Sequence, residues 1–427
     1  MLRRLFPDVY EGWLVVGASG TVVLVVAATF FYGFGTIFNE VREEFHWSNA
    51  STALAFSLRN EVGGIGAIVV GVALDRIGPR RVLFTGITVA AVGVIGMSFM
   101  QELWHFYLVM VVIAFGSSAA GGQVGLTAIA TWFQDRRAFA MSIMTLGGGI
   151  GGVFVIGIGV LVELSGWRWA LRVLAFVMLA VGLIVGSNIR SRPEGHPQPL
   201  DGIAPRESDD GTEVRTVERW GVPVRAAITS RSFMLLSLAM FGTNFGFVAL
   251  IVHQIPFLET EIGVSKTVAS ATIAVFTLSS IIGRIGFGYL GDRYEKRFVL
   301  AVAVALLSLG LAVIAAAPNL WVAILAIAIA APGFGGTIPL RPSIAADYFG
   351  TRHFGTINGT MQFVSTTGGA GGPWVIGRLV DLNNDYTLGW IIAAVVVGVI
   401  GIPAALVATA PTALRARYRD GEATSAG

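Results

Sequence analysis

Four charged side chains lie inside long apolar segments of this sequence, and they are its strongest candidates for chemistry: Arg59, Glu61, Arg284 and Arg341. A charge at the centre of a bilayer costs about 2.5 to 3.5 kcal/mol on insertion scales, so it is rarely kept there without a role. An arginine offers a planar fork of N–H donors that fits a carboxylate with two parallel hydrogen bonds. These residue types predict recognition of an anion, with a structural ion pair as the alternative for each arginine.

The depth of the two later arginines follows from their distance to an acidic residue at the inner end of the same segment. Arg284 precedes Asp292 by eight residues, or about 12 Å of helix, which is near the middle of a hydrocarbon core of about 30 Å. Arg341 precedes Asp347 by six residues, or about 9 Å, where it either meets substrate or extends to the interface. We therefore expect both arginines to be candidates for substrate binding, with Arg284 ranked above Arg341.

Arg59 and Glu61 form an unusual pair in the outer half of one segment. They precede Asp75 by 16 and 14 residues, or about 24 and 21 Å of helix. Residues two apart point to nearly opposite sides of a helix, so the pair cannot be a simple ion pair. A desolvated carboxyl can exchange protons near neutral pH, which makes Glu61, with Arg59, the proton-coupling candidate. A structural partnership with an arginine elsewhere is the alternative.

Uncharged polar residues complete the candidate substrate site. Amides and hydroxyls in membrane helices are more often hydrogen-bonded between helices than to a ligand. The candidates to hydrogen-bond a substrate are Gln123, Asn244, Asn358 and Gln362, and Tyr32 is a candidate to line a cavity through the first span, with helix packing as the alternative for each.

The elements that must position these residues are membrane-spanning helices. Hydrophobic residues make up 54% of the 427 residues and charged residues 13%, with a mean hydropathy of +0.74, whereas soluble domains carry about 25% charged residues. A spanning helix needs about 20 apolar residues. Twelve stretches qualify, which predicts an all-α integral membrane protein with twelve transmembrane helices: about 13–37, 51–74, 82–100, 106–133, 138–162, 169–188, 232–257, 267–290, 298–317, 320–348, 354–379 and 388–409.

An internal repeat divides these helices into two halves of six. The segment from Gly71 to Arg76, followed by Arg80 and Arg81, returns as Gly288 to Arg293, followed by Lys296 and Arg297. Residues 190–231 between the halves are rich in proline, glycine and charge, a composition that favours a cytoplasmic linker, either a solvated tether or a partly amphipathic stretch around 214–227. The predicted domains are therefore residues 1–189, the linker 190–231, and residues 232–427 with a cytoplasmic tail.

The distribution of charge predicts orientation and excludes several functions. Most of the 29 lysines and arginines fall on one side, which predicts that both termini are cytoplasmic. A plasma (inner) membrane is expected on base rates alone. They form no basic patch interleaved with aromatics, so no nucleic-acid partner is expected. Neither lysine, Lys266 nor Lys296, lies in a phosphate-binding Gly-Lys-Ser/Thr loop, the histidines form no zinc motif, and there is no cysteine. We expect no enzyme activity, no cofactor and no metal, and the glycine clusters at 147–152 and 368–372 predict close helix packing.

The repeated loop carries a family resemblance. The pattern Gly71-x-x-x-Asp75-Arg76-x-Gly78-x-Arg80-Arg81 resembles the loop signature of the major facilitator superfamily. Shorter pieces, including Glu11-Gly12-Trp13 and Arg192-Pro193-Glu194, resemble its monocarboxylate porter and oxalate:formate antiporter branch. Ser280 departs from that branch, which often has an acidic residue one turn before the arginine.

The resemblance implies a secondary active transporter that moves a small organic anion, a monocarboxylate in particular, through the lipid bilayer by alternating access. A proton would be carried with it or a counter-anion exchanged for it, and a twelve-helix bundle would function as a monomer. The same architecture carrying a sugar or an amphipathic drug is the alternative, and a non-transporting receptor or channel is a further one.

The repeated loops predict a gate at the inner face. A carboxylate at Asp75 can accept hydrogen bonds from a neighbouring helix N-terminus, and nearby arginines can pair with carboxylates and helix C-terminal carbonyls. The hypothesis is that this cluster stabilises the outward-open state, with static topology anchors as the alternative. Its members are Asp75, Arg76, Arg80, Arg81, Asp292, Arg293 and Arg297.

Overall fold

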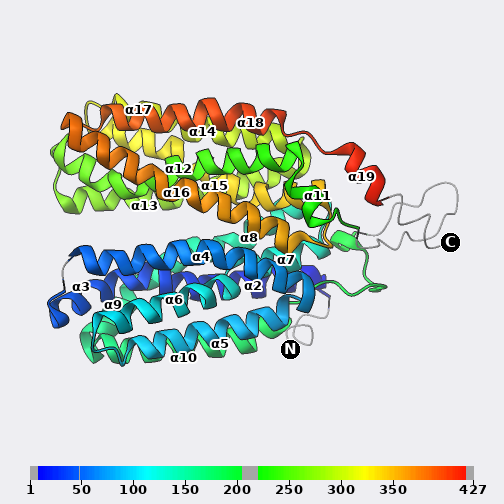
Figure 1. Ribbon diagram of the computed structural model, residues 1–427, viewed down its shortest axis with the longest axis horizontal. Coiled ribbons are helices and arrows are strands. Elements are labelled where there is room, and N and C mark those ends of the chain that lie inside the picture. The colour runs from blue at the N-terminus through cyan, green and yellow to red at the C-terminus, as the bar shows by residue number, and fades with distance from the viewer. Residues whose placement is uncertain (1–7, 48, 204–219, 420–427) are drawn as a thin grey trace, which may run out of the picture. The chain divides into compact units, whose positions relative to one another are not determined.

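The computed structural model describes residues 8–47, 49–203 and 220–419, apart from the side chains of some residues between 31 and 61. It is nearly all helical (Figure 1). Compact packing divides the chain into two units. Unit 1 comprises Met1–Gly221 and Thr351–Gly359, and unit 2 comprises Val222–Gly350 and Thr360–Gly427.

Helices of the first half run in the order α2 (Glu11–Ala27), a π-helical turn (Ala28–Tyr32), α3 (Gly33–Phe45), α4 (Asn49–Ile77), α5 (Pro79–Met97), α6 (Leu103–Ala120), α7 (Gly122–Trp132), α8 (Arg137–Ile150), α9 (Val155–Ser165) and α10 (Trp167–Ile184). The second half contains α11 (Val224–Ile228), α12 (Arg231–Thr260), α13 (Lys266–Arg293), α14 (Lys296–Ala315), α15 (Leu320–Phe349), α16 (Phe354–Asn383), α17 (Thr387–Val395), a second π-helical turn (Val396–Gly401), α18 (Ile402–Val407) and α19 (Thr412–Arg419).

Ten helical stretches of the described residues are long and apolar enough to cross a membrane. The predicted second and eleventh spans are also helices, α4 with 29 residues and α16 with 30. The predicted all-α membrane fold of twelve long helices is therefore confirmed. Several spans contain an irregular turn, such as the π-helical turn between α2 and α3, that apolar length alone cannot reveal.

Glycines allow the first and fifth helices of each half to pack backbone against backbone. A Cβ added at Gly147 on α8 would lie 2.0 Å from the carbonyl oxygen of Gly20 on α2. A Cβ at Gly372 on α16 would lie 2.1 Å from the carbonyl oxygen of Phe245 on α12. Only glycine permits such an approach, which confirms that these clusters serve helix packing.

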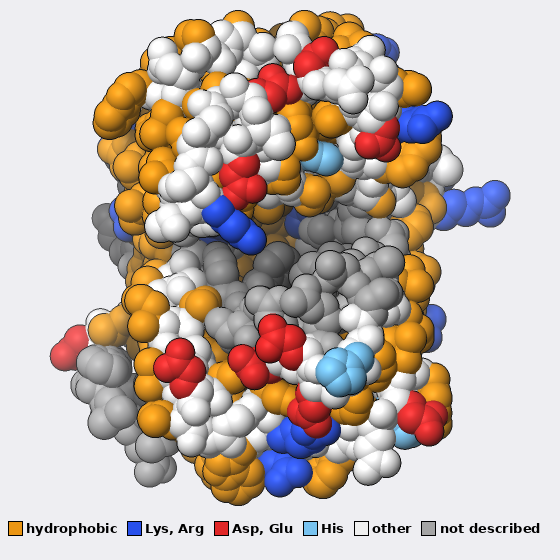
Figure 2. Space-filling view, turned by 90° about the vertical axis from the view of Figure 1, so that its left-hand side faces the viewer, with side chains coloured by type: hydrophobic (Ala, Val, Ile, Leu, Met, Phe, Trp, Pro, Cys, Tyr) orange, Lys and Arg blue, Asp and Glu red, His pale blue; other side chains and the backbone are white. Residues whose placement is uncertain are grey.

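Large apolar side chains cover the outer surface of both units. Ile156 and Leu164 on α9 and Phe176 on α10 are 77%, 82% and 72% exposed, and Trp321 on α15 is 77% exposed. Figure 2 looks onto the helix ends, where acidic and other polar side chains gather, while hydrophobic side chains cover the flanks. Such exposed apolar surface fits a lipid environment.

The two halves repeat an aromatic anchor near the ends of their fourth and sixth spans. In unit 1 the indole N–H of Trp132 donates to the carbonyl oxygen of Arg190 at 2.8 Å. In unit 2 the hydroxyl of Tyr348 donates to the carbonyl oxygen of Ala408 at 2.7 Å. The aromatic pairs Trp132-Phe133 and Tyr348-Phe349 thus make equivalent contacts, so the internal repeat extends to hydrogen bonding.

Candidate functional site

The structure brings Arg341 and Gln362 together inside unit 2. Arg341 lies on α15 and Gln362 on α16, and Nη1 of the guanidinium donates to Oε1 of the amide at 2.5 Å. Nε of Arg341 is buried without a hydrogen-bond partner among the described residues. One edge of the guanidinium is therefore bound to a neutral group, and the Nε donor is left unsatisfied by the described residues.

A second hydrogen bond orients the Gln362 amide. Its Nε2 donates to Oγ1 of Thr366 at 3.4 Å, one turn further along α16, and that hydroxyl donates to the carbonyl oxygen of Gln362 at 3.0 Å. The amide is thereby held with its oxygen toward Arg341 and its nitrogen toward Thr366. The guanidinium accordingly meets an acceptor that carries no net charge.

The other unit 2 candidates occupy neighbouring helices. Arg284 lies on α13, partly exposed, with a buried Nε, and Ser280 one turn before it is 2% exposed. Asn244 on α12 donates its Nδ2 to the carbonyl oxygen of Ser365 on α16 at 2.8 Å. Asn244 thus makes a hydrogen bond between two helices. Among the predicted substrate residues of unit 2 that the structure describes, a hydrogen bond joins Arg341 to Gln362.

Gln123 and Asn358 belong to unit 1 with the start of α16. Nε2 of Gln123, on α7, donates to the carbonyl oxygens of Ala67 on α4 and Gly355 on α16, both at 3.1 Å. Asn358 is 1% exposed, and its Oδ1 has no hydrogen-bond partner among the described residues. Gln123 therefore links three helices, while the Asn358 oxygen is left to accept.

Arg59 is buried against the π-helical turn of the first span. The side chain is 5% exposed, and Nη1 donates to the carbonyl oxygen of Phe30 at 2.8 Å. A π-helical turn displaces backbone carbonyls from the regular hydrogen-bond ladder and occurs often at functional sites. The side chains of Tyr32 and Glu61, two further predicted site residues, are not among those that the structure describes.

Asp75 caps the N-terminus of α16 within unit 1. Oδ1 accepts the backbone N–H of Gly355 at 2.8 Å, and Oδ2 accepts the backbone N–H of Thr356 at 2.8 Å and its hydroxyl at 2.6 Å. A carboxylate satisfies the free amides at the positive end of the helix dipole. This is the kind of contact that the sequence predicted for Asp75, whereas its part in gating stays a proposal.

The remaining gate candidates are more exposed. Arg76, Arg80 and Arg81 are exposed, and the Arg80 guanidinium lies 5.4 Å from the ring centroid of Phe84. In unit 2, Arg293 is exposed and lies over the Tyr289 ring at 4.3 Å.

The repeat loop of unit 2 has its own ion pairs. Nζ of Lys296 lies 3.9 Å from Asp292 and 2.6 Å from Asp347, and Arg297 pairs with Glu295. The second copy of the loop is thus bound to the end of α15 through Lys296, a residue that was not among the gate candidates.

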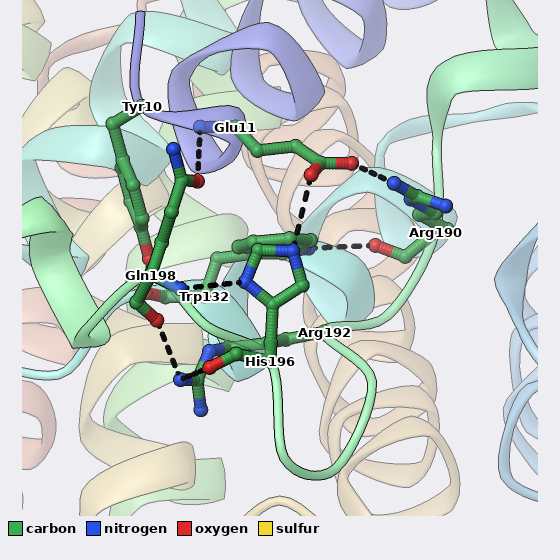
Figure 3. A network of polar contacts seen from close by, with 7 residues as sticks. All are labelled: Tyr10, Glu11, Trp132, Arg190, Arg192, His196 and Gln198. Atoms are coloured by element: carbon green, nitrogen blue, oxygen red, sulfur yellow. Dashed lines mark hydrogen bonds and ion pairs between the residues drawn. The ribbon is translucent and has the colours of Figure 1, made fainter.

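Sequence reasoning missed a buried polar cluster at the start of α2 (Figure 3). The Glu11 carboxylate lies between two partners, pairing with Arg190 through Oε1 and with Nε2 of His196 through Oε2 at 3.2 Å. Nδ1 of His196 accepts the backbone N–H of Gln198 at 3.3 Å, and the Gln198 side chain accepts the backbone N–H of Glu11 at 3.1 Å. The first residues after the sixth span are therefore part of unit 1 and are packed against the start of α2.

Asp201 extends this docking to the loop before α8. Its carboxylate, 6% exposed, accepts three successive backbone N–H groups, those of Gln134, Asp135 and Arg136, at 3.0 to 3.2 Å. Tyr10 donates its hydroxyl to the carbonyl oxygen of Trp132 at 2.7 Å, and burial raises the pKa of that phenol far above its ordinary value. Glu11 of the motif Glu11-Gly12-Trp13 and Arg192 of the motif Arg192-Pro193-Glu194 both belong to this cluster. Nothing in the spacing of the two motifs predicts that they lie close together.

The sequence is similar to those of known transporters. The chain is 29% identical to the Fujikurins efflux protein of Gibberella fujikuroi over 56% of this chain and 48% of that protein, and 28% identical to an MFS-type transporter of Gibberella moniliformis over 71% and 69%. It is 25% identical to monocarboxylate transporter 13 of Rattus norvegicus over 91% of this chain and 86% of that protein.

Solved structures agree with the fold. The crystal structure of the transporter FucP in the outward conformation superposes with a TM-score of 0.71 at 16% identity, covering 93% of this chain and 99% of FucP. The family model described as Major Facilitator Superfamily matches residues 20–373 and, in a second match, residues 234–425. These relatives are transporters and not enzymes. The chain belongs to the Major Facilitator Superfamily.

Proposed function

We propose that this transporter moves a small organic anion, a monocarboxylate in particular, by secondary active transport with alternating access. The observation that carries the proposal is Arg341, a guanidinium in a spanning helix whose one hydrogen bond among the described residues goes to the neutral amide of Gln362. An uncompensated positive charge within the membrane is costly, and a bound anion offsets that cost. The relatives that are monocarboxylate transporters support the same substrate class.

Arg341 and Gln362 are proposed as the centre of the substrate site, together with Arg284. Their planar donors suit a carboxylate. Asn244, Asn358, Gln123 and Tyr32 remain proposed substrate-binding residues that contribute hydrogen bonds. Arg59 and Glu61 remain the proposed proton-coupling residues, and the coupled partner is a proton or a counter-anion.

Asp75 is the proposed inner gate residue. The cap it provides to Gly355 and Thr356 stabilises the start of α16 in one arrangement, and we propose that this arrangement breaks during transport. Arg76, Arg80, Arg81, Asp292, Arg293 and Arg297 are proposed to support the gate. Both termini are proposed to be cytoplasmic, in line with the bias of basic residues. The protein is proposed to act as a monomer in a plasma membrane.

A second candidate is efflux of a larger amphipathic compound. The similarity to the Fujikurins efflux protein favours it, although the chain spans about half of that protein. Transport of a sugar by the same fold is a further alternative with less support. Arg341 argues against a neutral or cationic cargo, because a bound molecule without negative charge would leave the guanidinium uncompensated.

The test is competition during uptake into proteoliposomes. We expect saturable uptake of radiolabelled lactate, pyruvate or formate, inhibited by unlabelled monocarboxylates and unaffected by sugars. If no carboxylate is taken up and an amphipathic compound is transported saturably instead, the anion proposal is rejected and efflux is favoured.

A further inference from the structure

The pairing of Arg341 with an amide and not with a carboxylate suggests a role for Gln362 itself. We propose that Gln362 is the positioning residue that sets charge selectivity: it fixes the Arg341 guanidinium while leaving its charge for a monoanionic cargo. This inference rests on the proposed anion transport and specifies how the same site would choose among molecules of equal shape.

Geometry determines which edge of the guanidinium receives the cargo. Oε1 of Gln362 takes Nη1 at 2.5 Å. A carboxylate that binds with two parallel hydrogen bonds then uses the remaining pair of donors, Nε and Nη2. Nε is buried and has no hydrogen-bond partner among the described residues, so a bound carboxylate would satisfy it.

The orientation of the amide is fixed from its other end. Nε2 of Gln362 faces Oγ1 of Thr366 at 3.4 Å, so the amide oxygen is the group presented to Arg341. An amide oxygen aligns the guanidinium by hydrogen bonding but leaves its full positive charge. A carboxylate at the same place would both align and neutralise it.

Charge at this position therefore separates cargo classes. With glutamine, one positive charge is balanced by one negative charge on the cargo, which favours a monocarboxylate over its neutral amide. With glutamate, the Arg341 charge is already balanced and an incoming anion meets a repelling carboxylate. Gln362→Glu changes the charge with almost no change in side-chain size, which makes it the decisive substitution.

The experiment measures binding of matched acid and amide probes to the purified full chain in detergent by thermal shift. The pairs are lactate with lactamide, pyruvate with pyruvamide, and acetate with acetamide. We expect the parent to prefer the acid at least tenfold in one or more pairs. Gln362→Glu and Arg341→Gln should each reduce this preference at least tenfold.

Gln362→Met is the matched control, since it removes the amide but keeps the Arg341 charge. It should weaken acid binding less than tenfold and keep the preference for the acid. A merely structural role for Gln362 would instead make the methionine and glutamate variants equally defective for acid and amide. Elution from a sizing column and the melting temperature without probe establish that each variant is folded.

The outcomes separate the inference from the proposed function. If the parent prefers acids and Gln362→Glu keeps that preference, the charge-selectivity role is wrong while anion transport stands. If the parent prefers no acid over its amide, or binds none of the probes, both the proposed monocarboxylate function and this inference are overturned. If Gln362→Glu does not fold, the acid-over-amide preferences of Arg341→Gln and Gln362→Met are compared instead. A preference that is lost in Arg341→Gln and kept in Gln362→Met supports the inference, and equal loss in both variants overturns it.

Discussion

Thr356 donates both its backbone N–H and its hydroxyl to the same oxygen of Asp75, at 2.8 and 2.6 Å. The two residues are 281 positions apart in the chain, yet they meet within unit 1 at the start of α16. The contact joins one copy of the repeated loop to the helix that follows the tenth span. It gives this end of unit 1 a specific bond whose removal can be measured.

Asp75→Asn should destabilise the protein and alter transport. An asparagine keeps the shape but loses the charge at the helix N-terminus and one acceptor, which we expect to cost about 1 to 3 kcal/mol. The measurement combines a melting curve with the labelling rate of a single cysteine placed at the start of α16, in a chain that has no cysteine of its own. Asp135→Asn, on an exposed loop residue, is the control. Unchanged labelling together with unchanged transport would contradict a gating role for Asp75.

Asp201→Asn should loosen the segment that follows the sixth span. Its buried carboxylate accepts three backbone N–H groups before α8, and an amide can satisfy them only in part, at an expected cost of about 1 to 3 kcal/mol. Thermal unfolding in detergent measures the loss, with the exposed residue Glu194 changed to glutamine as the control. Equal melting temperatures for the two variants would show that the docking adds no stability.

Gly147→Ala should be strongly destabilising, because the added Cβ would lie 2.0 Å from the carbonyl oxygen of Gly20. Overpacking of this kind costs about 1 to 3 kcal/mol or more. Gly157→Ala is the matched control on α9, where nothing lies within 4 Å of the added Cβ, and it should be neutral or stabilise by up to about 1 kcal/mol. Comparison of the two melting temperatures tests the packing, and similar values would contradict it.

The contacts of Glu44 should make the stability of unit 1 sensitive to acid. It accepts hydrogen bonds from Nη1 of Arg168 and Nε1 of Trp167, both at 2.7 Å. Burial acts to raise the pKa of this carboxyl, but the hydrogen bonds from Arg168 and Trp167 and the charge of Arg168 outweigh it and leave the pKa below its ordinary value.

Because the folded-state pKa is the lower one, the contact stabilises the fold above the unfolded pKa of about 4.3 and is lost as pH falls through the folded value. Between pH 5 and pH 3 the melting temperature should therefore fall more for the parent than for Glu44→Gln. Parallel pH profiles would reject this linkage.

Much of the fold follows from the sequence because apolar length decides where a helix can span a membrane. The repeated loops also predicted that Asp75 would bind a helix N-terminus. They could not say which helix, since Gly355 lies 280 residues away and sequence periodicity carries no information about such distant pairs.

The rest depended on tertiary contacts. The composition after Arg190 indicated either a solvated tether or a partly amphipathic stretch. The side chains of His196 and Asp201 are instead buried within unit 1. The predicted surface stretch around 214–227 falls partly outside the described residues, and its end forms the short helix α11. Depth arguments ranked Arg284 above Arg341, but depth could not show that Arg341 would meet a neutral amide.

The most direct test of anion transport is uptake of radiolabelled monocarboxylates and dicarboxylates into proteoliposomes under an imposed pH gradient, comparing the parent with Arg341→Ala and Arg284→Ala. Our account predicts saturable uptake of a monocarboxylate that falls at least tenfold in Arg341→Ala, the loss expected when a charge-assisted contact of about 1.4 kcal/mol or more is removed. Uptake that follows the pH gradient would indicate proton symport, and uptake that requires an internal anion would indicate exchange. Undiminished uptake in both arginine variants, or no uptake of any carboxylate by the parent, would contradict the account.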